Sequence, residues 1–194
     1  MMDILEPAHP PREQPPPSRA FHRMPGTRGS SLRVFLDPGL GLSSDRQRVA
    51  ETTLDAAIEL ADADMGNVQL TDPEAGGLRI AAQRGFGEPF LRFFEVVRDE
   101  DGSVCGRAMK QIAPMMVRDV ALDPDLAGTP TLRILLGAGV RTVHSTPLLD
   151  ETGTMLGMLS VHYREVRQFA EVSQRLMWPL ARRAGRLLRA CPPG

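Results

Sequence analysis

The chain has 194 residues, of which 42% are hydrophobic and 24% are charged, as in a globular protein with one domain and extensions. Its formal net charge of -1 argues against a protein built mainly to hold nucleic acid, which needs a basic field. No stretch approaches the roughly 18 apolar residues of a membrane span, and the first residues lack the apolar core of a secretory signal. We therefore expect a cytoplasmic protein without a nucleic-acid or membrane partner.

Residues 1–43 form a leader that is rich in proline and glycine and has no sustained hydrophobic period. Such a composition is typical of largely disordered chain. Its one apolar fragment, Leu32 to Leu36, is expected to dock on the domain as a short strand, with a contact to a partner protein as the alternative. We expect the folded domain to span residues 44–190.

The domain is predicted to open with a helix and a hairpin. Ser44 and Gln47 form a capping box at the start of the helix, and apolar residues then recur every three or four positions up to Asp62. Two strands follow at residues 65–71 and 78–84, joined by the turn sequence Asp-Pro-Glu-Ala-Gly-Gly. This pattern predicts an antiparallel hairpin.

The middle of the chain is predicted to contain short helices and one short strand. Pro89 suits the first turn of a helix that runs to Val97, and Ser103 is the expected cap of a second helix that runs to about Gln111. Residues 114–117 are predicted to form an edge strand, and residues 131–136 a helical segment closed by glycines.

The last part of the chain contains a second hairpin and a long helix. The hairpin covers residues 142–164, and the helix runs from Glu165 towards Arg189 with a kink expected at Pro179. Hairpins at both ends of the sheet make it antiparallel and leave the first and last helices free to pack together on one face. The fold class is therefore α+β.

The register of the second hairpin decides which side chains share a face of the sheet. A three-residue loop, Glu151-Thr152-Gly153, would pair Asp150 with Thr154 and separate polar from apolar residues. The polar face predicted in this way has members from three strands: Asn67, Gln69, Thr71, Thr142, His144, Thr146, Leu148, Leu156, Met158, Ser160 and His162. From the pattern alone, this face either lines a pocket or is half solvated on an uncovered sheet.

Four segments, in this order along the chain, resemble a GAF domain. They are MGNVQLTDPEAGGLRIAAQRGF, DGSVCGRAM, VRDVALDPDLAG and GVRTVHSTPLLDETGTMLGMLSVHY. The resemblance covers about residues 45–165 and is greatest to the GAF domains that accompany bacterial sensor kinases. It implies a GAF/profilin-like, six-stranded antiparallel sheet with the N- and C-terminal helices packed on one face, a ligand-sized cavity and dimerisation through those helices.

The resemblance does not identify a ligand or a cofactor. GAF domains that bind cyclic nucleotides carry an asparagine-lysine signature, and this chain has no Asn-Lys pair. GAF domains that bind tetrapyrroles anchor the pigment through a cysteine followed by histidine or leucine, whereas Cys105 is followed by Gly106 and aromatic residues are only 5% of the chain. The expected partners are an unknown small molecule, a second copy of the chain, and a histidine kinase or other signalling protein.

Cys105 has two alternative roles. A buried reduced cysteine acts as a small hydrophobe, and packing is the role we expect. The alternative is a GAF-type free methionine sulfoxide reductase, since those enzymes also carry a cysteine before glycine in this region. Their chemistry needs a resolving cysteine, but none occurs around residues 135–140, and Cys191 lies beyond the last helix.

The two histidines near the candidate pocket are expected to act as hydrogen-bonding wall residues. In the predicted register His144 and His162 share a face, roughly 7 to 8 Å apart. Two histidines without a third ligand make a weak metal site, so no metal is expected. GAF domains that match here usually have glutamine in place of His144. The candidate pocket residues are Asn67, Gln69, Cys105, His144, Thr146, Ser160 and His162.

The last helix carries many arginines, which would suit nucleic acid or an anionic membrane, or would simply form a solvated face. Its apolar stripe favours a helix of a homodimer with a wet basic side. That stripe consists of Phe169, Val172, Leu176, Leu180 and Leu187. Together these observations predict a cytoplasmic sensory or regulatory module that binds a small molecule or signals through protein contact, without catalysis.

Overall fold

The computed structural model describes residues 29–40, 45–167 and 171–191. The described helices and strands, in chain order, are α1 (Ser30–Leu36), α3 (Arg46–Ala61), β1 (Met65–Asp72), β2 (Gly77–Arg84), α4 (Glu88–Phe93), β3 (Val96–Val97), α5 (Val104–Gln111), β4 (Met115–Val117), α6 (Pro130–Gly137), β5 (Thr142–Leu149), β6 (Met155–Tyr163) and α7 (Glu171–Ala190). No helix in the described ranges is long and apolar enough to cross a bilayer.

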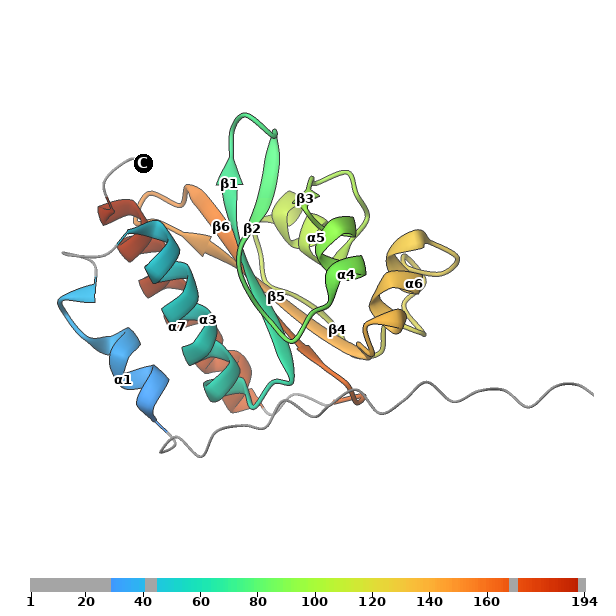
Figure 1. Ribbon diagram of the computed structural model, residues 1–194, viewed down its shortest axis with the longest axis horizontal. Coiled ribbons are helices and arrows are strands. Elements are labelled where there is room, and N and C mark those ends of the chain that lie inside the picture. The colour runs from blue at the N-terminus through green and yellow to red at the C-terminus, as the bar shows by residue number, and fades with distance from the viewer. Residues whose placement is uncertain (1–28, 41–44, 168–170, 192–194) are drawn as a thin grey trace, which may run out of the picture.

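The strands form one six-stranded sheet in the order β3-β2-β1-β6-β5-β4, and every neighbouring pair is antiparallel. Helices α3 and α7 lie on one face, and the shorter helices α4, α5 and α6 lie on the other (Figure 1). The structure confirms the predicted α+β class, the antiparallel sheet and the shared face of the first and last helices of the domain.

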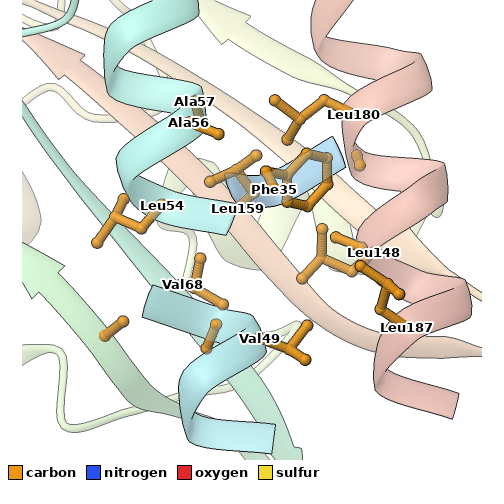
Figure 2. Packing of buried hydrophobic residues seen from close by; sticks show 14 of the residues in the cluster. Phe35, Val49, Leu54, Ala56, Ala57, Val68, Leu148, Leu159, Leu180 and Leu187 are labelled. Atoms are coloured by element: carbon orange, nitrogen blue, oxygen red, sulfur yellow. The ribbon is translucent and has the colours of Figure 1, made fainter. Parts of the chain in front are cut away.

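The main core lies between the sheet and helices α3 and α7. Figure 2 shows Leu54 of α3 and Leu187 of α7 on either side of the sheet residues Val68 and Leu148, and all four belong to one buried cluster. Burial of one large aliphatic side chain contributes roughly 1.5 to 3 kcal/mol, so this layer supplies much of the stability of the fold. The opposite face of the sheet is therefore the one available for a site.

Helix α1 docks on this core, which confirms the docking predicted for the leader, but it is a helix rather than a strand. Phe35 is 1% exposed and belongs to the main core. The Arg183 guanidinium donates to the carbonyl oxygens of Phe35 and Asp37, and the backbone N–H of Ser31 donates to Glu59. A helix satisfies its own backbone, so it can dock through one face without a free sheet edge. Residues 1–28, which were expected to be disordered, lie outside the described residues.

Several predicted boundaries differ by a few residues. The described N-cap of α3 is Asp45, whose carboxylate accepts from the Arg48 N–H, while the predicted cap Ser44 lies outside the described residues. The helix predicted from Pro89 to Val97 ends at Phe93, and Val96–Val97 form strand β3 instead, which has too few residues to show a period. The last helix begins at Glu171 rather than at Glu165.

The predicted register of β5 and β6 is wrong along most of the hairpin. Asp150 does pair with Thr154, as predicted, but a β-bulge next to Leu148 shifts the pairing by one residue from there on. Ser145 therefore pairs with Ser160, and His144 pairs with Val161. A shift of one residue exchanges the two faces of a strand. Ser145 thus moves to the face of Ser160, whereas His144 and Thr146 move to the face of α3 and α7.

Candidate functional site

A cavity lies between the sheet and the helices of its second face. It draws on β1, α4, α5, α6, β5 and β6. Its lining residues are Asn67, Gln69, Phe90, Phe94, Ser103, Val104, Cys105, Thr131, Leu135, Val143 and His162. The walls bound about 300 Å³ of atom-free space, including the part open to solvent. The centre of a water molecule fits within about 20 Å³ of this space. In this conformation the cavity has room for about one water molecule, which needs roughly 10 to 15 Å³ by the same measure.

Four buried polar atoms on this cavity lack a hydrogen-bond partner among the described residues. They are Asn67 Oδ1, Gln69 Oε1, Gln69 Nε2 and His162 Nδ1. The three side chains are 2%, 0% and 2% exposed, respectively. Buried polar groups in folded proteins are nearly always hydrogen-bonded, and leaving one unpaired costs roughly 1 to 3 kcal/mol. These atoms are therefore free to pair with water or with a ligand.

The strands bring these side chains together through simple alternation. Asn67 and Gln69 are two residues apart on β1, so they share a face. Asn67 pairs with Ser160, and Met65 pairs with His162, across β1 and β6. The prediction that Asn67, Gln69, Ser160 and His162 share one face is therefore confirmed.

The start of α5 places Cys105 beside the sheet. Ser103 caps the helix by accepting from the Gly106 N–H at 3.0 Å, as predicted. A Cβ on Gly106 would lie 2.6 Å from the carbonyl oxygen of Arg98, so the glycine after Cys105 permits a close backbone approach. This steric requirement accounts for the Cys-Gly pair without any chemistry at the thiol.

Cys105 closes a small network of hydroxyl groups. Its Sγ lies 3.2 Å from Ser160 Oγ and 3.5 Å from Ser145 Oγ, and the two hydroxyls are 2.8 Å apart. Burial raises the pKa of the Cys105 thiol, and the two serine hydroxyls oppose that rise only in part. The thiolate, which is the nucleophilic form, is therefore scarce at neutral pH.

His162 is enclosed by aromatic rings. Its imidazole lies edge-on to Phe86, with ring centroids 4.9 Å apart, and edge-on to Phe90 at 5.9 Å. Burial lowers the pKa of His162 to about 3, because the charged imidazolium would lose its hydration. His162 is thus a neutral group at physiological pH.

Charged groups lie around the cavity rather than in its wall. The Arg107 guanidinium on α5 pairs with the carboxylates of Asp123 and Asp125, in the segment between β4 and α6. In the same segment Asp119 pairs with Arg141, which lowers the pKa of that carboxyl. These ion pairs hold the segment before α6 against α5 and the start of β5. No lining residue is Asp, Glu, Lys or Arg.

Ser160 contacts Cys105 but does not line the cavity. The other two predicted site residues, His144 and Thr146, do not reach the cavity. The bulge places them on the helix-covered face, where Thr146 Oγ1 lies 3.4 Å from His144 Nε2. The expectation that His144 and His162 share a face is therefore wrong. Within the described part of the chain, no group of three or more His, Cys, Asp or Glu side chains is placed to hold a metal ion.

The sequence analysis missed Phe90 and Phe94 as residues of the cavity wall, and it missed Ser145 as a neighbour of Cys105. Phe90 and Phe94 are four residues apart, so they lie on one side of α4 and its cap, with ring centroids 4.6 Å apart. That spacing was a usable signal for a buried aromatic wall. Ser145 could not have been found by pattern, because its face depends on the bulge.

Comparisons with known proteins agree with this architecture. The family model of the GAF domain matches residues 43–189. No individual curated protein matches the chain. A domain assigned to a two-component sensor histidine kinase of Sinorhizobium meliloti superposes with a TM-score of 0.56 at 24% identity, over 74% of this chain and 90% of that chain.

Two further solved structures have similar folds. A GAF domain/HD domain protein of Geobacter sulfurreducens has a TM-score of 0.62 at 18% identity, over 76% of this chain and 94% of that one. The free methionine-R-sulfoxide reductase of Neisseria meningitidis, in complex with its substrate, has a TM-score of 0.62 at 20% identity, over 78% and 83%. At such identities the likeness shows the fold alone. Because the family model covers most of the chain, the protein belongs to the GAF domain family.

Proposed function

We propose that this chain is a sensory or regulatory GAF module that binds a small molecule in the cavity between β1, β6, α4 and α5, without catalysis. One observation carries the proposal: Asn67, Gln69 and His162 line one cavity, and four of their buried polar atoms have no partner among the described residues. A stable fold tolerates such atoms where a ligand or water completes them. His144 and Thr146 play no part in this site.

A ligand that fills the cavity is expected to stabilise the fold. At a hundred times its dissociation constant it should add about 2.7 kcal/mol to the free energy of unfolding. A thermal-unfolding screen of metabolites measures this gain. Gln69→Leu should abolish this gain, because leucine cannot make the hydrogen bonds of the amide to a ligand.

The matched control is Gln47→Leu, since Gln47 is exposed on α3 and lies outside the cavity. That variant should keep the full ligand gain. A ligand gain that survives in Gln69→Leu would place the binding site elsewhere. Native mass spectrometry of the purified chain gives an independent answer, because it reports any bound mass and the oligomeric state together.

The reductase alternative rests on the fold shared with the Neisseria meningitidis enzyme. Against it stand the raised thiol pKa of Cys105 and the position of Cys191, which belongs to the core on the other face of the sheet. Cys191 donates to the Leu187 carbonyl oxygen at 3.3 Å. A sulfenic acid on Cys105 would therefore have no resolving thiol within the described residues.

Cys105→Ser is expected to leave ligand binding nearly intact and to lower the free energy of unfolding by about 1 kcal/mol, since Ser145 and Ser160 can pair with the new hydroxyl. The unmodified protein should not reduce free methionine sulfoxide when thioredoxin is supplied. Turnover that disappears in Cys105→Ser would establish the reductase function instead.

The proposal also includes an output through protein contact, with a histidine kinase or another signalling protein as partner and a homodimer through the terminal helices. In α7, Leu180 and Leu187 pack in the chain's own core, whereas Leu176 and Trp178 are 44% and 39% exposed. Among the described side chains of α7, these are the two large apolar ones left exposed for a second copy. Both cysteines are free thiols, which suits the cytoplasm.

A further inference from the structure

We propose that the cavity selects an uncharged molecule that carries an N–H donor beside a carbonyl acceptor, the chemistry shared by a primary carboxamide and by the lactam edge of a nucleobase. This inference rests on the proposed function, because it names the class of ligand for the same site. Three features of the cavity support it: the absence of a counter-charge, the pairing capacity of its amides, and its aromatic walls.

No residue of the lining offers a charge to a ligand. Asp, Glu, Lys and Arg are absent from the wall, and the one titratable ring, that of His162, is neutral because burial lowers its pKa to about 3. The nearby Arg107 is already paired with two carboxylates. A carboxylate, phosphate or ammonium group would lose its hydration here without an ionic partner, and such a transfer is strongly unfavourable.

The unpaired atoms define what the ligand must present. Both ends of the Gln69 amide are free, so this side chain can donate one hydrogen bond and accept another in parallel. A glutamine or asparagine amide pairs in this bidentate way with a partner that has a donor next to an acceptor. Asn67 Oδ1 accepts one further N–H. A carboxamide or a lactam supplies both halves of this pattern.

The remaining walls favour a flat ring. Phe90 and Phe94, of α4 and its cap, line the cavity from the helix side together with Leu135 of α6. Val143 pairs with His162 across β5 and β6. Aromatic side chains stabilise a planar ligand by stacking or by edge-on contact. The centre of a water molecule fits within only about 20 Å³ of the cavity. An aromatic ring therefore enters only when the walls that contain Phe90 and Phe94 move outward. Phe90 belongs to helix α4, and Phe94 is its C-cap.

The test compares neutral amides with their matched acids by thermal unfolding of the full chain at neutral pH. The probes are nicotinamide against nicotinate and uracil against orotate. At least one amide should stabilise the protein, with an affinity at least about tenfold above that of its acid, which corresponds to about 1.4 kcal/mol. A shift from nicotinamide alone assigns a carboxamide ligand, and a shift from uracil alone assigns a lactam.

Two variants test the route of recognition. Gln69→Leu should remove the amide shift, and Asn67→Leu should weaken it. Either variant suffices if the other does not fold, and Gln47→Leu should leave the shift intact.

A result in which an acid stabilises as well as its amide overturns this inference and leaves the proposed function standing. If none of the four probes shifts the unfolding transition, the inference is also overturned. The native mass spectrum then decides separately whether any ligand is bound.

Discussion

Acidification from about pH 7.5 to about pH 5 is expected to lower the free energy of unfolding by about 4 kcal/mol, well before most carboxylates titrate. The cause is the burial of two neutral imidazoles on opposite faces of the sheet. Burial lowers the pKa of His144 to about 4 and that of His162 to about 3, from an ordinary value of 6.5.

The sign follows from which state binds the proton. The unfolded chain protonates each histidine near pH 6.5, whereas the folded chain keeps it neutral until about pH 4 or 3. The unfolded state therefore binds more protons between these values, and stability falls as the pH falls. Each histidine contributes about 2 kcal/mol by pH 5. The lowered pKa values of Asp119 and Asp150 act only at lower pH, near their ordinary value of 3.8 and below.

Urea unfolding at several pH values measures this effect. His144→Gln and His162→Gln should each remove about half of the loss, because glutamine does not titrate, and the double variant should be nearly flat down to about pH 5. The single variants also serve as controls for each other. Stability of the unmodified chain that stays constant over this range would show that the imidazoles are not buried as described.

Gly185→Ala is expected to destabilise the fold by roughly 3 kcal/mol or more, although the same change raises helix propensity by about 1 kcal/mol in a free helix. Gly185 lies in α7 at its contact with β5. A Cβ there would come within 2.0 Å of the carbonyl oxygen and 2.5 Å of the carbonyl carbon of Leu149. Backbone atoms cannot rotate away, so α7 would have to move off the sheet.

Gly137→Ala is the matched control, since Gly137 is an exposed helical glycine at the end of α6 with no atom within 4 Å of the added methyl. That variant should be neutral or up to about 1 kcal/mol more stable. The pair is compared by denaturant unfolding at neutral pH. Equal effects at the two positions would mean that α7 does not press on β5.

Much of the fold followed from local signals in the chain. The helix cap at Ser103 and the face shared by Asn67 and Gln69 depend on spacings of two or three residues, and the structure confirms both. The resemblance of four segments to GAF domains predicted six strands, one of which, β3, has only two residues and no pattern of its own. Local chemistry and alternation act within a few residues, so sequence alone determines them.

The register of the second hairpin was decided only by the tertiary structure. Every residue of β5 is buried, and so is nearly every residue of β6, because the sheet is covered on both faces. When both faces are buried, the alternation of polar and apolar residues no longer indicates which face a residue lies on. The bulge next to Leu148 therefore cannot be recognised from the sequence pattern. This single irregularity took His144 out of the predicted site and placed Ser145 beside Cys105.

Contacts between distant segments decided the rest. The docking of α1 depends on Glu59 and Arg183, which lie far along the chain from the leader. The unpaired state of Gln69 depends on the described side chains of α4, α5 and α6 failing to reach it. The sequence thus determined which polar residues occupy the face of β1. Only packing determined that a cavity remains beside them, because a cavity is set by the distances between elements and not by the order of residues within one.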